Sequence, residues 1–262
     1  MKSAVLASVL FCAACSSALK EPSPIATYAP GHADGRTANE LVAAANAAWA
    51  HRGEAGKAEA AQGLYLDAAV VDPHRFDAIA GAMRAISYRI ENEQHVAREK
   101  LAKISVELGQ LCQRRAPKQP ECDYRLAIAL GQYARENTAS AKDAVNRMVG
   151  LLHRAIAAAP RLDAGGPHRV LAYLLLRAPG WPLGPGDEEA GLVQARAAVQ
   201  LAPNAENELV LGEALAKNGH PNEARAAYAK AAELATAAHE AGEPEAARWL
   251  AQARAGLAKN SG

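Results

Sequence analysis

The chain has few aromatic side chains and almost no net charge. Phe, Trp and Tyr together make up 5% of its 262 residues, and stretches in which β-branched or aromatic residues alternate with polar ones are rare. Such stretches form β-strands, so few strands are expected. The formal net charge is +1, whereas a protein that binds nucleic acid carries a basic face or stripe. No nucleic-acid partner is therefore expected.

The sequence patterns of common catalytic and metal sites are also missing. The chain has no G-x-S-x-G, no H-E-x-x-H and no EF-hand spacing, and its eight histidines are scattered. No enzyme mechanism can be assembled from these residues. We therefore expect a protein that is not an enzyme and that holds neither a cofactor nor a metal ion.

Apolar residues, by contrast, make up 50% of the chain, and alanine dominates them. Alanine is the best helix former, and its small side chain lets neighbouring helices approach closely. The length is sufficient to bury a core in one elongated domain or two small ones. Composition therefore indicates an all-α protein.

The first residues, "MKSAVLASVLFCAAC", combine one lysine, a short apolar run and small residues. This pattern is typical of a secretory signal, and the run is too short to span a membrane. The residues before Cys15 resemble a bacterial lipobox, although Cys12 stands where leucine or valine is usual. We expect a signal peptide over residues 1–14, lipidation of Cys15 and a flexible tether over 15–36. Cleavage after Ala18, giving a soluble secreted protein, is the alternative.

Two further cysteines, Cys112 and Cys122, bracket a short polar stretch. In an oxidising compartment such a pair favours a disulfide, which would contribute about 2–3 kcal/mol. A metal site is the weaker interpretation, because two thiols without a nearby pair of histidines do not complete a zinc site.

A spaced pattern recurs along the chain: a small residue, a large one four later, a small one three after that, and a proline five further on. Because spacings of three and four lie on one face of a helix, the small residues admit a neighbouring helix and the large one fills the gap. The proline ends the helix. The copies begin at Ala61, Ala97, Met148, Gly191 and Ala224, about 36, 51, 43 and 33 residues apart.

The first and last copies resemble complete tetratricopeptide repeats (TPRs), which have a period of roughly 34 residues. The matching positions are Trp49, Gly56, Ala61, Tyr65, Ala68 and Pro73 in the first, and Leu211, Gly212, Gly219, Ala224, Tyr228 and Ala231 in the last. A capping box, Thr37 to Glu40, opens the first helix. The expected fold is an all-α, TPR-like solenoid of helical hairpins over residues 37–262, with enlarged central loops and a C-terminal capping helix starting near Pro244.

The stretch "RAPGWPLGPGD", residues 177–187, interrupts this helical pattern with three prolines, three glycines and Trp181. We interpret it as the enlarged turn of the fourth helical pair, with Pro179 after the first helix and Asp187 as the cap of the second. The prolines stiffen the loop, so Trp181 is held in a fixed place.

Residues 163–228, from "DAGGPHRVLAYLLLRAPGWPLGPGD" to "NEARAAY", resemble the core of the TatT family, the T component of tripartite ATP-independent periplasmic (TRAP) transport systems. Upstream, "CDYRLAIALGQYAREN" is similar to a family segment, although Arg125 stands where a tryptophan is usual. The resemblance implies a periplasmic, lipid-anchored protein, on the outer membrane by preference. It also implies docking of the soluble substrate-binding component and the capacity to hold an apolar ligand.

Two functions therefore follow from the sequence. The first is an interaction module, because solenoid surfaces bind partner proteins without catalytic groups. The second is a carrier with a central cavity for a hydrophobic small molecule, lined by Tyr124, Tyr133, Tyr173 and Trp181, with Arg169 meeting a carboxylate head. Core packing is the alternative role for the aromatic residues. The sequence is also compatible with a homo-oligomer.

Overall fold

The structure, a computed structural model, describes residues 19–31, 33–93 and 97–260, so Cys15 and the signal segment lie outside the described residues. These residues form eleven α-helices and two short 3-10 helices and no β-strand. The helices are α1 (Ala38–Ala50), α2 (Lys57–Val71), α3 (Phe76–Asn92), α4 (Arg98–Arg115), α5 (Pro120–Glu136), α6 (Ala141–Ala158), α7 (Gly166–Arg177), α8 (Glu188–Leu201), α9 (Ala205–Lys217), α10 (Pro221–Glu240) and α11 (Ala246–Lys259). The 3-10 helices are η1 (Ile25–Thr27) and η2 (Thr138–Ser140). No described helix has both the length and the apolarity to cross a membrane.

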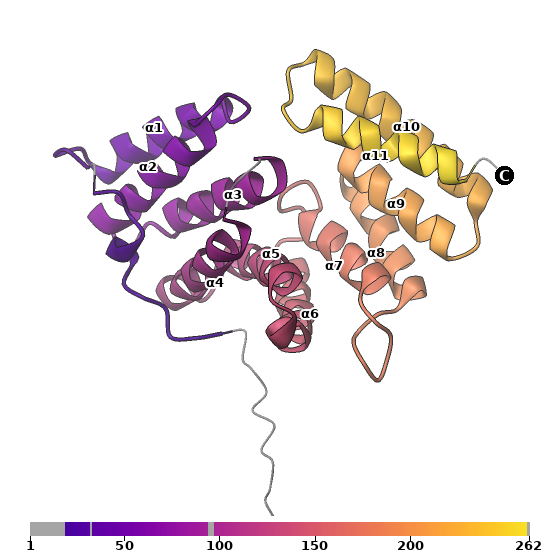
Figure 1. The fold of residues 1–262 in the computed structure, drawn as a ribbon, viewed down its shortest axis with the longest axis horizontal. Coiled ribbons are helices and arrows are strands. Elements are labelled where there is room, and N and C mark those ends of the chain that lie inside the picture. Colours follow the sequence, from indigo (N-terminus) through magenta and orange to yellow (C-terminus); the bar gives the residue numbers. More distant parts are fainter. Residues whose placement is uncertain (1–18, 32, 94–96, 261–262) are drawn as a thin grey trace, which may run out of the picture.

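Each helix packs against the next along the chain, which gives five hairpins, from α1–α2 to α9–α10, followed by α11 (Figure 1). The five copies of the sequence pattern fall on α2, α4, α6, α8 and α10, the second helix of every hairpin. The expectation of an all-α, TPR-like solenoid with a C-terminal capping helix is confirmed.

Local signals set where the helices begin. The Thr37 hydroxyl accepts from the Glu40 backbone N–H while the Glu40 carboxylate accepts from the Thr37 N–H, so the capping box opens α1 as predicted. Asp187 caps α8 by accepting from the Ala190 N–H at 2.9 Å. Each cap satisfies a backbone donor that the helix itself leaves without a partner.

Glycines of the repeat pattern permit close packing of the last helices. Gly212 on α9 and Gly256 on α11 both lie directly against the ring of Tyr228 on α10, with no room for a methyl group at either position. Tyr228, the large residue of the last copy, therefore fills the space that glycines on both neighbouring helices leave.

The wide spacing of the central copies comes from long helices. Helices α4, α5 and α6 have 18, 17 and 18 residues, and only residues 116–119 separate α4 from α5. Cys112 and Cys122 lie on facing turns of these two helices and are joined by a disulfide, with Cα atoms 5.4 Å apart. The enlarged loops expected at the centre are thus one loop, residues 178–187, plus extra helical turns.

Part of the segment expected to be a flexible tether packs on the domain. Ile25 in η1 is buried against the core, and η1 contacts α2. The Tyr28 hydroxyl donates to the Glu107 carboxylate of α4, and Glu21 pairs with Arg114. These contacts hold residues 19–30 against α2 and α4.

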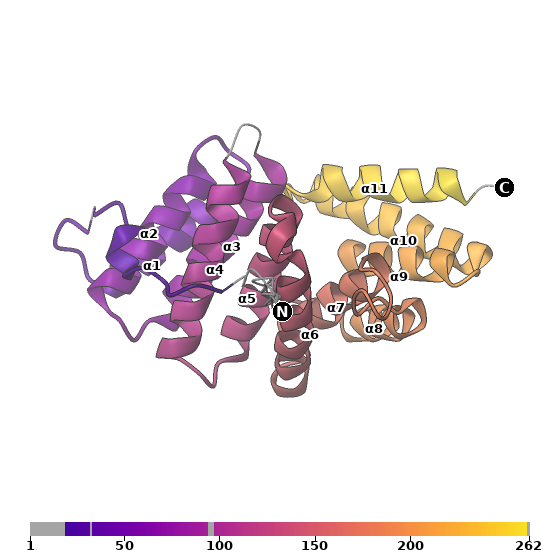
Figure 2. The same ribbon diagram turned by 60° about the horizontal axis from the view of Figure 1, so that its bottom comes forward.

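The helices form two arms, α1–α6 and α7–α11, that diverge from a shared base and approach again at their tips (Figures 1 and 2). At the tips, Arg52 in the α1–α2 turn pairs with Glu243 and Glu245 in the α10–α11 turn. The solenoid is thereby closed into a ring.

Candidate functional site

A cavity of about 820 Å³ lies between the two arms. Its walls come mainly from α1, α3, α5, α7, α9 and α11, the first helix of each hairpin and the capping helix, with a contribution from α6. In a curved stack of hairpins one set of helices lines the concave side. The cavity is therefore the concave face of this solenoid.

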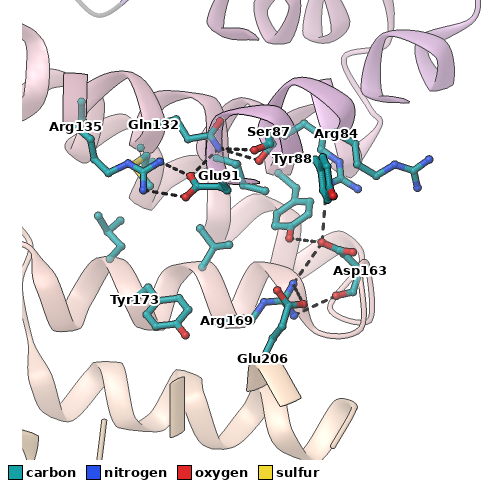
Figure 3. A pocket seen from close by; sticks show the side chains of 18 of the residues that line it. Arg84, Ser87, Tyr88, Glu91, Gln132, Arg135, Asp163, Arg169, Tyr173 and Glu206 are labelled. Atoms are coloured by element: carbon teal, nitrogen blue, oxygen red, sulfur yellow. Dashed lines mark hydrogen bonds and ion pairs between the residues drawn. The ribbon is translucent and has the colours of Figure 1, made fainter. Parts of the chain in front are cut away.

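Helix α3 presents one face to the cavity. Arg84, Ser87, Tyr88 and Glu91 are spaced by three, one and three residues, which places them on a single side of the helix. Helix α5 supplies a hydrogen-bond donor for two of these residues. The Gln132 amide donates to Ser87 Oγ at 2.9 Å and to Glu91 Oε1 at 3.1 Å. Figure 3 shows this row above the cavity.

The Glu91 carboxylate is ionised in this setting. Burial alone would raise its pKa, but the hydrogen bond and charge of Arg135, the Gln132 amide and the charge of Arg248 together lower the pKa of Glu91 below its usual value. Arg135 is the ion-pair partner of Glu91. These residues form a fixed polar wall.

A second polar cluster surrounds Asp163 in the α6–α7 turn. The buried Tyr124 hydroxyl donates to Asp163 Oδ2 at 2.6 Å, and Arg125 and Arg169 approach the same oxygen to 3.8 and 3.5 Å (Figure 3). Burial and the nearby carboxylate raise the pKa of Tyr124 well above its usual value. Burial opposes ionisation of Asp163, but Arg125, Arg169, the Tyr124 hydroxyl and Arg84 lower its pKa. Asp163 is thus a carboxylate and Tyr124 a neutral donor.

Arg169 on α7 is already surrounded by partners. Its Nη1 donates to Asn207 Oδ1 at 2.9 Å, and its Nη2 lies 3.4 Å from Glu206 and 3.5 Å from Asp163. The fully buried Asn207 also donates from Nδ2 to the carbonyls of Ala164, Ala198 and Ala202. Arg169 therefore ties the α6–α7 turn to α9.

Tyr173, one turn after Arg169, continues this wall. Burial raises the pKa of Tyr173 to about 12, so its hydroxyl stays protonated. The Arg177 guanidinium stacks on its ring at 4.1 Å from the centroid and forms two hydrogen bonds, of 2.9 and 2.6 Å, to Glu213.

Apolar side chains complete the base of the cavity. They come from α5, α6 and α7 and lie where the two arms join: Ile128, Val145, Met148, Val170 and Leu174. The site thus combines an apolar floor with polar walls, as ligand-binding pockets do.

Of the five residues predicted to bind a ligand or partner, the structure brings three together: Tyr124, Arg169 and Tyr173 line the cavity. Tyr133 does not. It follows Tyr124 by nine residues, a rotation of about 180° around the helix, and lies beside Lys20 and Glu107 on the other side of α5. Trp181 does not line the cavity either, because its loop points away from both arms.

The Trp181 loop is closed by backbone hydrogen bonds. The Gly186 N–H donates to Pro179 O at 2.8 Å, and the Asp187 N–H donates to Leu175 O at 2.9 Å. At its tip the Trp181 and Leu183 side chains are 90% and 70% exposed. Figure 1 shows the loop between α7 and α8 standing out from the body. Core packing, the alternative interpretation of Trp181, is wrong.

Further site residues, which were not predicted from the sequence, lie at the tips of the arms. Trp49 contacts Tyr88 edge to face, with ring centroids 5.7 Å apart, and Arg84 and Arg52 stack on Trp49 at 4.5 and 4.9 Å. Arg248 and Trp249 on α11 line the same region. The polar spacing on α3 was a readable signal for Arg84, but nothing local links α3 to a helix more than 150 residues later.

No protein-family model matches this chain, and no curated protein sequence matches it. The fold is similar to the crystal structure of TTC0263, a thermophilic TPR protein in Thermus thermophilus. The TM-score is 0.63 at 18% sequence identity, and the alignment covers 84% of this chain and 99% of that chain. The likeness shows that this chain has a TPR-like fold.

Proposed function

We propose that this protein is a non-enzymatic scaffold that docks a partner protein through the Trp181 loop. The observation that carries this proposal is the exposure of Trp181 and Leu183 at the tip of a hydrogen-bonded loop. An exposed tryptophan costs free energy in water, and buried tryptophans dominate the energy of protein interfaces. Because the loop is already ordered, docking loses little conformational entropy.

The sequence supports a compartment and a partner for this docking. The leader and Cys15 favour a lipid-anchored periplasmic protein on the outer membrane, and the resemblance of residues 163–228 to TatT favours the substrate-binding component of a TRAP system. The Trp181 loop lies inside that stretch.

A pull-down tests the docking proposal. Immobilised protein without the leader is mixed with a periplasmic extract of the native host, and we expect a TRAP-type substrate-binding protein to be retained. Trp181→Ala should weaken retention about tenfold or more with an unchanged melting temperature. The control, Val71→Ala, removes another exposed apolar side chain and should retain the partner. Equal retention by wild type and Trp181→Ala would refute docking through this loop.

The cavity favours a second function, binding of a hydrophobic small molecule. Its volume of about 820 Å³ and its apolar floor fit a ligand of lipid size. Native mass spectrometry of protein purified from its host should then show a bound mass that organic extraction removes. A spectrum of apo protein alone, with no thermal shift across a series of fatty acids, would argue against this function.

A further inference from the structure

The arginines that line the cavity outnumber its carboxylates. Among the described residues the lining holds seven arginines and five carboxylates. Five of the arginines lie within 4 Å of a carboxylate, either in the lining or, for Arg177, on Glu213. Arg84 and Arg248 have no such partner in the described part of the chain, although both face the cavity.

Arg84 is held in place by neutral groups. Its Nη2 donates to the Tyr65 hydroxyl at 3.1 Å, and its guanidinium stacks on Trp49. Its Nε is buried and has no hydrogen-bond acceptor among the residues that the structure describes. These contacts fix the orientation of the side chain without neutralising its charge, although the charge acts on Asp163 from a distance.

Two further donors without acceptors come from the first turns of α11. Arg248 Nε and Trp249 Nε1 are buried and make no hydrogen bond among the described residues. Arg248 lines the same cavity as Tyr88 and Glu91 of α3, and its charge contributes to the lowered pKa of Glu91. Buried donors normally have partners. These three nitrogens are covered by protein atoms, so an anion in the cavity would contact the terminal Nη atoms of the two arginines and not their Nε atoms.

Arg169, which the sequence analysis assigned to a carboxylate head, is a poorer choice for an incoming anion. Its guanidinium already contacts Asn207, Asp163 and Glu206. A ligand oxygen there would compete with two carboxylates in place. Arg84 and Arg248 offer donors that no carboxylate occupies.

We infer that the cavity binds an amphipathic anion whose oxyanion head, a carboxylate or a phosphate, lies on the α3–α11 side between Arg84 and Arg248. This inference rests on the second proposed function and names its ligand class. The alkyl part of the ligand lies on the apolar floor of Ile128, Met148 and Leu174. Guanidinium groups match the geometry of both oxyanions and form charge-assisted hydrogen bonds with them.

Calorimetric titration of delipidated protein tests the inference with three probes of equal chain length: dodecanoate, dodecyl phosphate and uncharged dodecanol. We expect at least one of the two anions to bind about tenfold or more tightly than dodecanol, and the tighter one identifies the head group. Arg248→Met and Arg84→Met should each weaken that anion about tenfold and leave dodecanol unchanged. The control, Arg147→Met, removes an α6 arginine that is paired with Asp143 and is not among the lining residues, and it should change neither affinity.

The outcomes separate the two claims. Equal binding of dodecanol and both anions, or an Arg248→Met variant with wild-type affinity for the preferred anion, overturns the head-group site and leaves the cavity function standing. Failure of all three probes to bind counts against the cavity function itself. Arg248 lies in the first turn of α11 and is half-buried, so its variant should fold. If Arg84→Met does not fold, the affinities of Arg248→Met alone decide whether the head-group site exists.

Discussion

At the residue scale, the turn between α6 and α7 places the polar end of the cavity. Asp163, Ala164 and Gly165 have φ values of +50°, +53° and +82°. Three left-handed residues in succession reverse the chain in a short span and direct the Asp163 carboxylate toward Tyr124 and Arg169. Only the third of them is glycine, so the turn contains backbone strain that its hydrogen bonds offset.

Relief of that strain is measurable at Ala164. Left-handed backbone costs an L-residue about 1 kcal/mol more than glycine, and glycine loses about 0.5 kcal/mol through greater freedom in the unfolded chain. We expect Ala164→Gly to raise the free energy of unfolding by about 0.5 kcal/mol in urea titrations. Ala178, with φ of −71°, is the control: Ala178→Gly should lower it by a similar amount. A lower free energy of unfolding for Ala164→Gly would contradict the inference that the backbone is strained at Ala164.

The charge of Asp163 makes stability depend on pH. Its pKa is lowered in the folded state, so its contribution is complete above the unfolded value near 4 and is lost as the pH falls through the folded value. The Asp163 side chain is 39% exposed, so solvent weakens its charge interactions. Asp163→Asn should therefore lower the free energy of unfolding by about 1 kcal/mol at pH 7 and flatten its decline below pH 4, both followed by urea unfolding. The surface pair of Asp143 with Arg147 provides the control, since Asp143→Asn should cost less than about 0.5 kcal/mol.

At the scale of elements, the second helices of the hairpins were predictable and the first helices were only partly so. The second helices pack small residues on both neighbours, and that constraint leaves a regular pattern, as Ala61, Tyr65 and Ala68 show. The first helices also face the cavity, where Arg84, Gln132 and Arg169 replace apolar residues. Polar cavity residues weaken the amphipathic period that sequence analysis relies on.

Close packing between elements gives a test at Gly256 on α11. A methyl group there would overlap the Tyr228 ring, so Gly256→Ala should lower the free energy of unfolding by about 1–3 kcal/mol. Gly150 on α6 is exposed and has open space around it. Gly150→Ala should therefore stabilise by about 0.5–1 kcal/mol through helix propensity. Thermal and urea unfolding of both variants would reveal whether the effects have opposite signs.

The candidate site could be predicted in part for a related reason. Tyr124, Arg169 and Tyr173 were predicted from residue type, as aromatic side chains for a ligand cavity and a cation for its head group, and all three line the cavity. The prediction that Tyr133 lines the cavity was wrong because it considered residue type alone. It left out the rotation around α5 that separates Tyr133 from Tyr124. Arg84 and Arg248 were missed because they line one cavity only when the ring closes. That closure is a property of the accumulated curvature of all the hairpins, which no local pattern encodes.

At the scale of the whole molecule, contacts between the tips of the two arms close the ring. Arg52 bonds to Glu245 through Nε at 3.1 Å and Nη2 at 2.8 Å, and Nη2 also contacts Glu243. The Arg52 and Glu245 side chains are mostly buried. These contacts of Arg52 with Glu243 and Glu245, called the clasp below, hold the tips of the two arms together above the cavity.

Removal of the clasp should open the ring. Spin labels at positions 54 and 241 report the distance between the tips by pulsed electron resonance. In Arg52→Glu, repulsion from Glu243 and Glu245 should shift the distribution to longer distances and broaden it, with little change in helix content. Arg75→Ala, which removes a surface pair with Asp77, is the control. An unchanged distribution in Arg52→Glu would show that helix packing alone sets the closure.

The most direct test of the docking function is photo-crosslinking in intact cells of the native host, with p-benzoylphenylalanine placed at position 181. We predict one dominant adduct, with a TRAP-type substrate-binding protein, and no such adduct from the exposed position 230 on α10. A position-181 sample without that adduct, or with the same adducts as position 230, would contradict this prediction.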